Sequence, residues 1–190
     1  FCVIDDKKYK KSEKHILVDD VLICLQELAS LHRTKLACSV LAITGSNGKT
    51  TSKELITNVL RKKYNVLSTE GNLNNHIGVP LTLLKLNKNH QFAVIEMGAN
   101  HLKEIELLCE IAKPNFGLIT NIGKAHVEGF GSIDNILKGK TELYRYLKKN
   151  NGTVFVNSDD KKLSKKAAGL NSISYGNGSV YASQIIIDDI

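Results

Sequence analysis

The sequence of 190 residues lacks any long apolar run, and its longest apolar stretches are only a few residues. A membrane-spanning helix needs about 20 such residues, so none is expected. No basic stretch followed by an apolar segment opens the chain, so nothing there resembles a secretion signal. Internal repeats and low-complexity segments are also missing. With 42% hydrophobic and 24% charged residues, the composition indicates a folded globular protein rather than a disordered one.

The four cysteines lack the spacing of a metal site. Cys2, Cys24, Cys38 and Cys109 form no C-x-x-C pair, and none stands near a histidine at metal-ligand spacing. Cys24 and Cys109 fall within apolar helical patterns, where a buried free thiol is common. No disulfide framework is predicted, and this use of cysteine is typical of a reducing, cytoplasmic compartment.

The basic residues are not concentrated in one segment of the sequence. The formal net charge is +7 and the pI about 9.2, which permits nucleic acid, a membrane surface or small anions as partners. The densest basic clusters, residues 7–11 and 161–166, have no row of interleaved aromatic side chains of the kind that binds single strands. We therefore expect no nucleic-acid partner and assign the charge to a site for phosphate-bearing small molecules.

Apolar patterns along the chain alternate between strand and helix. Strands are expected at 40–43, 66–68, 92–96, 116–120 and 153–156, and helices at 50–63, 80–86, 101–113 and 132–149. The helix at 50–63 would bury one stripe, formed by Leu55, Ile56, Val59 and Leu60. Such alternation with short connections predicts an α/β fold with a doubly wound, mostly parallel sheet. In such sheets, ligands bind beyond the carboxyl ends of the strands.

Both ends of the chain depart from this pattern. Residues 18–31 read as an amphipathic helix, and residues 1–38 are too few to bury a core of their own. Residues 180–190 resemble a strand without a visible partner. The chain also begins with Phe1 rather than Met, so we expect it to be cut from a longer protein. The predicted organisation is the tail of an upstream domain over 1–38 and an incomplete domain over 39–190.

The strongest motif is a glycine-rich loop between an expected strand and an expected helix, formed by Gly45, Ser46, Asn47, Gly48, Lys49, Thr50 and Thr51. Its glycines let backbone N–H groups approach phosphate oxygens, and the helix N-terminus adds partial positive charge. Lys49 can reach the outer phosphates, and the Thr50 hydroxyl can ligate Mg²⁺. Ile43 stands where the common form of the motif has its first glycine. The alternative interpretation is an accidental glycine-rich turn.

Glu96 and His126 follow two other expected strands. A carboxylate at the carboxyl end of a core strand is a common ligand of nucleotide-bound Mg²⁺, although Glu96 could also be an ordinary solvated residue. His126 lies in the glycine-rich stretch 121–131 and could ligate a metal or orient a phosphate. A lone loop histidine could equally be structural or merely exposed.

Lys140 falls on the apolar stripe of the helix expected at 132–149, whereas Lys138 and Lys148 lie off it. A lysine in such a place can snorkel to the surface. Otherwise it requires a partner, a lowered pKa or a covalent change. The loop 70–80 also follows a strand and contains Asn74 and Asn75, whose segment could bind substrate or support the phosphate loop. A plain turn rich in Asn and Gly would explain it as well.

Together, these motifs resemble the ATP-dependent Mur ligases of peptidoglycan synthesis. The loop 45–51 has the form that this family uses, which accounts for Ile43. The stretches 71–80, 96–101 and 126–132 carry the rest of the resemblance, which is densest over 43–160. Within the family, the similarity is strongest to the members that add D-alanyl-D-alanine to UDP-N-acetylmuramoyl-tripeptide.

The resemblance implies part of a three-domain protein. The family has an N-terminal domain for the UDP part of the substrate, a central ATP-binding domain and a C-terminal domain that carries the incoming amino acid or dipeptide. Residues 1–38 would end the first domain and include a connecting helix, and 39–190 would form most of the central domain. The family's adenine-contacting Asn motif and its third domain have no counterpart in these 190 residues.

The family's residue roles transfer to matching positions. Lys49 and the loop amides would hold the β- and γ-phosphates of ATP, and Thr50 and Glu96 one Mg²⁺. His126 is similar to the ligand of a second Mg²⁺. Lys140 matches the lysine that the family carbamylates, and a carbamate would turn its cation into a metal-binding anion. Lys49, Lys140 and His126 are therefore the expected catalytic residues.

The implied reaction passes the γ-phosphoryl group of ATP to the tripeptide's terminal carboxylate. The amine of D-alanyl-D-alanine then attacks the acyl phosphate, and phosphate leaves. A monomeric cytoplasmic enzyme is expected. One alternative is another amide-forming ligase of the family, such as folylpolyglutamate synthase, and the other is a nucleotide-binding module that is inactive as an isolated piece. The stretches 74–76 and 126–131 favour the D-alanyl-D-alanine members.

Overall fold

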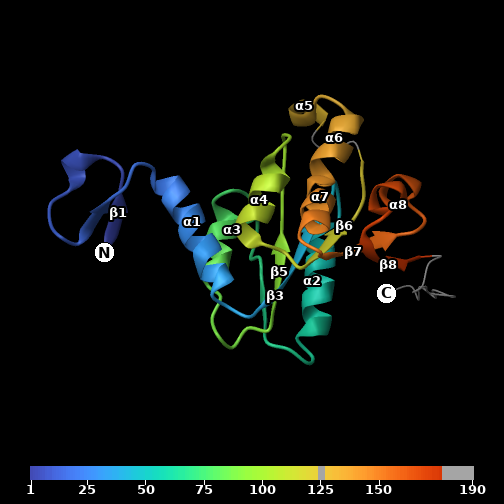
Figure 1. The fold of residues 1–190 in the computed structure, drawn as a ribbon, viewed down its shortest axis with the longest axis horizontal. Coiled ribbons are helices and arrows are strands. Elements are labelled where there is room, and N and C mark those ends of the chain that lie inside the picture. Colours follow the sequence, from blue (N-terminus) through green and yellow to red (C-terminus); the bar gives the residue numbers. More distant parts are fainter. Residues whose placement is uncertain (124–126, 177–190) are drawn as a thin grey trace, which may run out of the picture.

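A six-stranded parallel sheet forms the centre of the computed structural model, which describes residues 1–123 and 127–176 (Figure 1). Its strands are β3 (Ser39–Thr44), β4 (Val66–Ser68), β5 (Phe92–Glu96), β6 (Phe116–Ile119), β7 (Thr153–Asn157) and β8 (Asn171–Tyr175). They lie in the order β4-β5-β3-β6-β7-β8, and every neighbouring pair is parallel. The predicted doubly wound α/β fold is therefore confirmed, and each of the five strands expected between residues 40 and 156 lies within one residue of an observed one.

Helices follow most of the strands. They are α1 (Val21–Thr34), α2 (Lys49–Leu60), α3 (Gly78–Leu83), α4 (Glu104–Ala112), α5 (Val127–Phe130), α6 (Ile133–Lys140), α7 (Glu142–Lys149) and α8 (Lys161–Ala167). The sequence patterns did not predict α8 and β8, which extend the sheet by one strand beyond β7. The strand expected at 180–190 lies outside the described residues. Within the described part of the chain, no helix combines the length and apolar character that a membrane span requires.

The two faces of the sheet pack against different helices because side chains alternate along each strand. On one face, Val40 and Ala42 of β3 join a core that includes residues of α1, α3, α4 and α7. On the other face, Leu41 and Ile43 join a smaller cluster that receives Ile56 and Leu60 from α2. Among the helices that the structure describes, α2 is the one that contributes to this second cluster.

Two helices replace the single helix that was expected over 132–149. The break lies at Thr141, the residue that caps the end of α6. Its hydroxyl donates to the carbonyl oxygen of Leu137 at 2.7 Å, and its N–H donates to the same oxygen. Such side-chain bonds to the preceding turn compete with regular helix geometry. The apolar stripe nevertheless continues across the break, because Ile136 of α6 and Leu143 of α7 are both fully buried.

The buried stripe of α2 differs from the expected one. Leu55 and Val59 are 63% and 71% exposed, whereas Lys53 and Thr57 are buried. The prediction for these two apolar residues is therefore wrong. The apolar pattern indicated the helix, but part of that pattern lies on a surface that the described residues leave open.

Residues 1–38 contain a small separate sheet and a helix that docks on the main body. The strands β1 (Cys2–Ile4) and β2 (His15–Leu17) pair in parallel around the short 3₁₀ helix η1 (Lys7–Tyr9), away from the central sheet (Figure 1). Helix α1 packs against α3 and α4, and its Ala29 is fully buried. The connecting helix thus shares the core of the α/β unit.

Arg33 fixes the end of α1 to the loop that follows α4. The side chain is buried and donates to the backbone oxygens of Ala112 at 3.1 Å and Lys113 at 3.3 Å, and to Asn115 Oδ1 at 3.1 Å. The same Asn115 oxygen accepts from the N–H of Val40, the second residue of β3. One guanidinium therefore joins α1, α4 and the central strand.

We expect Arg33→Leu to lower the free energy of unfolding by about 3 kcal/mol, because each buried acceptor left without a donor costs about 1–3 kcal/mol. Urea unfolding followed by circular dichroism measures this change. Arg61→Leu is the matched control: Arg61 is exposed and makes one long hydrogen bond, to Ser68 at 3.5 Å. Similar losses for both variants would contradict the structural role of Arg33.

Candidate functional site

The glycine-rich loop connects the end of β3 to the start of α2. Gly45 has a φ of 143°, and a side chain there would collide with Thr120. Gly48 has a φ of 74° and precedes Lys49, the first residue of α2, without offering a side-chain cap. The first N–H groups of a helix have no intrahelical acceptor. The loop therefore presents an uncapped helix N-terminus of the kind that binds phosphate.

The segment after β6 holds this loop in place. Thr120 Oγ1 donates to the carbonyl oxygen of Asn47 at 2.6 Å, and Asn121 Nδ2 donates to the same oxygen at 3.0 Å. Asn121 Oδ1 accepts from the N–H of Asn47 at 3.1 Å, and Ser46 exchanges hydrogen bonds with the backbone of Gly123. Sequence reasoning gave Thr120 and Asn121 no such role. Both residues directly follow a parallel strand, so they lie at the same edge of the sheet as the loop. That position could have predicted their role.

Lys49 curls back over the loop that precedes it. Its Nζ donates to the carbonyl oxygens of Gly45 at 3.0 Å and Ser46 at 3.4 Å. These are the contacts of a lysine whose ammonium group lies beside the phosphate-binding backbone. A phosphate oxygen could replace these neutral acceptors with a charged one, which gives the stronger interaction because donor and acceptor are then both ionised.

Glu96 is a buried carboxylate, with 2% of the residue exposed. Its Oε2 accepts from Thr50 Oγ1 at 2.9 Å, and its Oε1 accepts from Asn74 Nδ2 at 2.8 Å. The Glu96 N–H donates to Thr69 Oγ1 at 2.9 Å. The interpretation of Glu96 as a solvated residue at a strand end is therefore wrong. The structure brings Thr50, Glu96 and Asn74 together from three separate segments.

The Thr50 hydroxyl and the Glu96 carboxylate are oxygen ligands of the kind that Mg²⁺ prefers. The described residues contain no group of three or more His, Cys, Asp or Glu side chains that could hold a metal. Mg²⁺ commonly binds through one or two protein oxygens together with phosphates and water. The pair therefore fits an ion that a nucleotide helps to hold.

Lys140 is buried at the end of α6, with 1% of the residue exposed, so the snorkelling interpretation is wrong. Its Nζ donates to the carbonyl oxygen of Ala99 at 3.2 Å and lies 5.5 Å from the centre of the Phe130 ring. Burial, together with the positive charge of Lys49, lowers the pKa of Lys140 to about 8, although Glu104 and Glu142 oppose the shift. The amine therefore has a larger neutral fraction at physiological pH than an ordinary lysine, although the protonated form still predominates.

A polar cavity of about 450 Å³ lies beside the phosphate loop. Lys49, Asn74 and Asn75 line it, together with His76 and the backbone around Ala99, whose carbonyl accepts from Lys140. The two predicted substrate residues therefore face the same space as the loop lysine. Asn75 Oδ1 also accepts from the N–H groups of Ile77 and Gly78 at the start of α3.

Two further carboxylates shape the wall of this cavity, and sequence reasoning missed both. Glu104 Oε2 accepts from the N–H groups of Asn100 at 2.6 Å and His101 at 3.2 Å. Glu142 is buried and accepts from the N–H groups of Lys103 and Glu106 at the start of α4. Both carboxylates fix the segment whose Ala99 carbonyl meets Lys140. Glu142 stands two places after Lys140, next to the apolar stripe that continues into α7. That position is the sequence signal that could have identified it.

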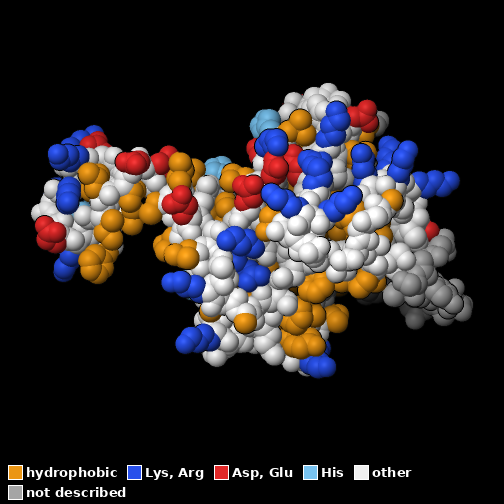
Figure 2. Space-filling view, in the orientation of Figure 1, with side chains coloured by type: hydrophobic (Ala, Val, Ile, Leu, Met, Phe, Trp, Pro, Cys, Tyr) orange, Lys and Arg blue, Asp and Glu red, His pale blue; other side chains and the backbone are white. Residues whose placement is uncertain are grey.

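Two other expectations concern His126 and the surface charge. His126 lies outside the described residues. Lys and Arg side chains are scattered over the face shown in Figure 2 rather than gathered into one stripe. That distribution matches the scatter of basic residues along the sequence.

Comparison with known proteins finds close relatives. The curated UDP-N-acetylmuramoyl-tripeptide--D-alanyl-D-alanine ligase of Haemophilus influenzae is 42% identical over 190 residues, covering 97% of this chain and 41% of the relative. The enzyme of the same name from Bacillus subtilis is 42% identical over 164 residues, covering 86% of this chain and 35% of the relative. The chain therefore spans well under half of the length of these relatives.

Solved structures show the same similarity. A crystal structure of MurF from Acinetobacter baumannii matches with a TM-score of 0.82 at 38% identity, covering 90% of this chain and 39% of that one. The structure of MurF from Thermotoga maritima in complex with ADP matches with a TM-score of 0.84 at 33% identity, covering 92% of this chain and 41% of that one. The family model described as the Mur ligase middle domain matches residues 43–188. The chain therefore belongs to the Mur ligase family and carries its middle domain.

Proposed function

We propose that this chain is the nucleotide-binding part of an ATP-dependent ligase that joins D-alanyl-D-alanine to UDP-N-acetylmuramoyl-tripeptide. The observation that carries the proposal is the buried Glu96 carboxylate bonded to Thr50, directly beside the loop lysine Lys49. The names of the relatives that are 42% identical support these substrates, and the ADP complex of the Thermotoga maritima protein supports the nucleotide.

The phosphate loop would bind the nucleotide through backbone and side chain together. The uncapped start of α2 supplies N–H groups, and Gly45 and Gly48 leave room for the phosphates to approach. Lys49 would exchange its two carbonyl contacts for the outer phosphates. Thr120 and Asn121 keep the loop in the required shape by holding Asn47. These contacts would position the terminal phosphoryl group of a bound nucleotide for attack by a carboxylate.

Thr50 and Glu96 would hold one Mg²⁺, and His126 with the carbamylated form of Lys140 would hold a second. The ions supply charge neutralisation for the transferring phosphoryl group. Asn74 supports the first of these sites because its amide fixes Glu96 Oε1 and leaves the other oxygen toward Thr50.

We also propose that Lys140 is carbamylated. Its neutral amine would attack CO₂, forming an N–C bond and releasing one proton, so that the buried cation becomes an anion. Burial and the nearby charge of Lys49 favour loss of the proton, and the lowered pKa of about 8 leaves a substantial neutral fraction. An anion would also relieve the repulsion between Lys140 and Lys49 and could ligate a metal.

The cavity lined by Asn74 and Asn75 would receive part of the peptide substrate, because it opens beside Lys49. The reaction would proceed through an acyl phosphate, which the amine of D-alanyl-D-alanine attacks. Residues 1–38 would end the UDP-substrate domain and 39–190 would belong to the ATP-binding domain. We expect a monomeric protein of the cytoplasm, and no ligation by the 190-residue chain alone.

Glu96→Gln should weaken the binding of a fluorescent ADP analogue about tenfold when Mg²⁺ is present, equivalent to about 1.4 kcal/mol. The loss should disappear in EDTA, because the amide oxygen can still accept from Asn74 and the amide N–H can donate to Thr50 Oγ1, so that only the metal ligand is weakened. Fluorescence titration in both buffers measures the difference. Glu110→Gln, at an exposed position on α4, is the matched control and should change neither affinity. An equal loss with and without Mg²⁺ would argue against a metal role for Glu96.

Incubation with ¹³C-labelled bicarbonate should give a carbamate signal by NMR that Lys140→Met removes. At fixed dissolved CO₂, the signal should grow as the pH rises through about 8, because the neutral amine is the reacting form and the pKa of Lys140 is about 8. Lys140→Met leaves every other amine of the chain in place, so the difference between the two proteins isolates Lys140. An unchanged signal in Lys140→Met would assign it to other amines of the chain.

The full-length protein that contains this chain should release ADP and phosphate only when UDP-N-acetylmuramoyl-tripeptide and D-alanyl-D-alanine are both present. Lys49→Ala should abolish this release, since the transferring phosphoryl group loses its main cationic contact. A coupled ADP assay measures the rate. Equal turnover with glutamate and a folate would favour the folylpolyglutamate alternative.

A further inference from the structure

A buried carboxylate on α7 joins that helix to the start of α4. Glu142 is the first residue of α7, and 2% of it is exposed. Its Oε1 accepts from the N–H of Lys103 at 2.8 Å, and its Oε2 accepts from the N–H of Glu106 at 3.0 Å. The exposed guanidinium of Arg145 lies 3.6 Å from Oε1. Each oxygen of this buried anion therefore has a partner on a helix that is distant in the sequence.

The start of α4 has no cap of its own. The first N–H groups of a helix lack intrahelical acceptors. Lys103, the residue before the helix, has a φ of 76° and provides no side-chain cap. A left-handed backbone is unfavourable for most residues other than glycine, and the bond from the Lys103 N–H to Glu142 holds it there. A negative charge also suits the positive end of the helix dipole. Glu142 therefore fixes the residue at which α4 begins.

The segment in front of α4 lies between Lys140 and the cavity beside the phosphate loop. The carbonyl oxygen of Ala99 accepts from Lys140 Nζ at 3.2 Å, and the N–H of Gly98 donates to the carbonyl oxygen of Asn74 at 2.8 Å. Ala99 and Gly98 line the polar cavity together with Lys49. The position of this segment therefore determines where Lys140 lies relative to the cavity.

Within the described residues, three hydrogen bonds join residues 140–142, at the junction of α6 and α7, to the segment 99–106. One comes from Lys140 and two go to Glu142. The bond from Lys140 is the longest of the three and depends on the ammonium group that a carbamate would replace. The bonds to Glu142 do not involve that group and would persist. Glu142 can therefore keep the junction against the cavity wall while Lys140 changes its charge.

We propose that Glu142 is a positioning residue for phosphoryl transfer, because it holds Lys140 and the cavity wall in a fixed place relative to the phosphate loop. The inference rests on the proposed ligase function, which assigns Lys140 to the metal-binding site of the reaction. Within the described residues, Glu142 forms no hydrogen bond with the phosphate loop or with Glu96. Its loss should therefore lower the rate of the reaction and leave nucleotide binding intact.

Glu142→Gln in the full-length protein that contains this chain tests the inference. The amide has one accepting oxygen, so one N–H group at the start of α4 loses its partner and faces an NH₂ group. We expect kcat for ADP release with both substrates present, measured per folded enzyme, to fall about tenfold, because small displacements of reacting groups have large effects. KM for ATP should change by less than about twofold, because the nucleotide contacts remain.

Two control variants separate positioning from stability. Glu106→Gln removes a partly exposed carboxylate from the first turn of α4 but leaves its N–H in place, so kcat should not change. Arg33→Leu loosens the other end of α4, where the guanidinium donates to the carbonyl oxygens of Ala112 and Lys113. It should lower the midpoint of thermal unfolding, but the folded enzyme should keep its kcat.

Three outcomes would overturn the inference. An unchanged kcat in Glu142→Gln would remove Glu142 from the reaction. Equal losses of kcat in Glu142→Gln and Arg33→Leu would leave Glu142 only the stability of α4, and a raised KM for ATP at unchanged kcat would place its effect in nucleotide binding. Should Glu142→Gln fail to fold, Glu142→Asp replaces it. Aspartate keeps both accepting oxygens on a side chain one methylene shorter, so it should still lower kcat several-fold, and an unchanged kcat would contradict the inference.

Failure of the proposed function gives a different result. If the wild-type protein releases no ADP with these substrates, that function is wrong, and the 190-residue chain then tests the position of Lys140 directly. Nuclear Overhauser contacts between the Lys140 ε-methylene and Ala99 should be present in this chain and in Glu106→Gln, and absent in Glu142→Gln. Contacts that persist in Glu142→Gln would overturn the positioning role whatever the reaction is.

Discussion

The buried carboxylate of Glu96 is the interaction on which the arrangement of the site depends. It lies at the end of β5, accepts from Thr50 at the start of α2 and from Asn74 in the loop after β4. A buried carboxylate is costly unless hydrogen bonds satisfy its oxygens, so neither partner can move away freely. The parallel sheet makes this meeting possible, because the carboxyl ends of β3, β4 and β5 lie at one edge. The phosphate loop, the cavity and the segment before α4 all take their positions from this edge.

Two buried lysines of the chain illustrate how environment decides the role of a residue type. Lys53 on α2 donates to the carbonyl oxygen of Thr69 at 2.6 Å and pairs with Glu54, so its charge is compensated. Thr69 in turn accepts from the N–H of Glu96, which links α2 to Glu96 by a second path. Lys140 has one carbonyl, an aromatic ring and the charge of Lys49 nearby. The charge of Lys53 is therefore compensated at short range, whereas burial and Lys49 lower the pKa of Lys140 against the opposing effect of Glu104 and Glu142.

The sequence predicted the central sheet well because its strands are short apolar runs that end at glycine, proline or polar loops. It predicted the phosphate loop for the same reason, since Gly45 and Gly48 occupy the backbone conformations that the loop requires. The break at Thr141 could not be predicted, because the apolar period continues through it and only a local hydroxyl bond ends α6. Asn74 was predicted as a candidate substrate residue, but its bond to Glu96 joins segments 22 positions apart, which no local pattern reveals.

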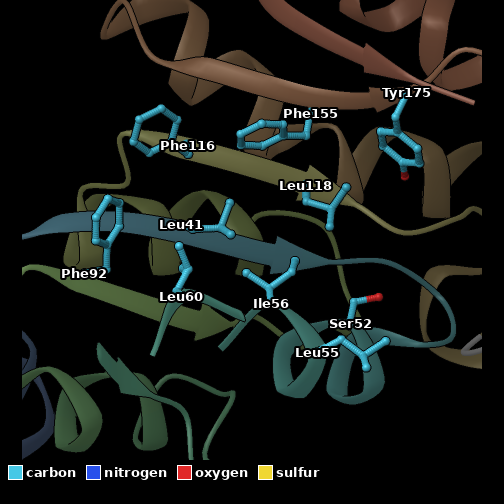
Figure 3. A pocket seen from close by; sticks show the side chains of 10 residues that line it. All are labelled: Leu41, Ser52, Leu55, Ile56, Leu60, Phe92, Phe116, Leu118, Phe155 and Tyr175. Atoms are coloured by element: carbon cyan, nitrogen blue, oxygen red, sulfur yellow. The ribbon is translucent and has the colours of Figure 1, made fainter. Parts of the chain in front are cut away.

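The error at Leu55 and Val59 has a different cause, and it concerns how a fold is completed. Their period is that of a buried helical stripe, yet both are exposed in the described residues. The apolar period of a helix reflects the contacts that the helix makes in the whole protein. The exposed fraction of a side chain reflects only the residues that are described around it. An apolar stripe that is exposed beside an apolar groove therefore indicates a missing contact rather than an accidental pattern. Ser52 and Leu55, which line an apolar groove on this face (Figure 3), lie only one or two turns from Lys49, so the groove and the phosphate loop share one helix. A substitution that shifts α2 on this face would therefore also move the start of the helix at the phosphate loop.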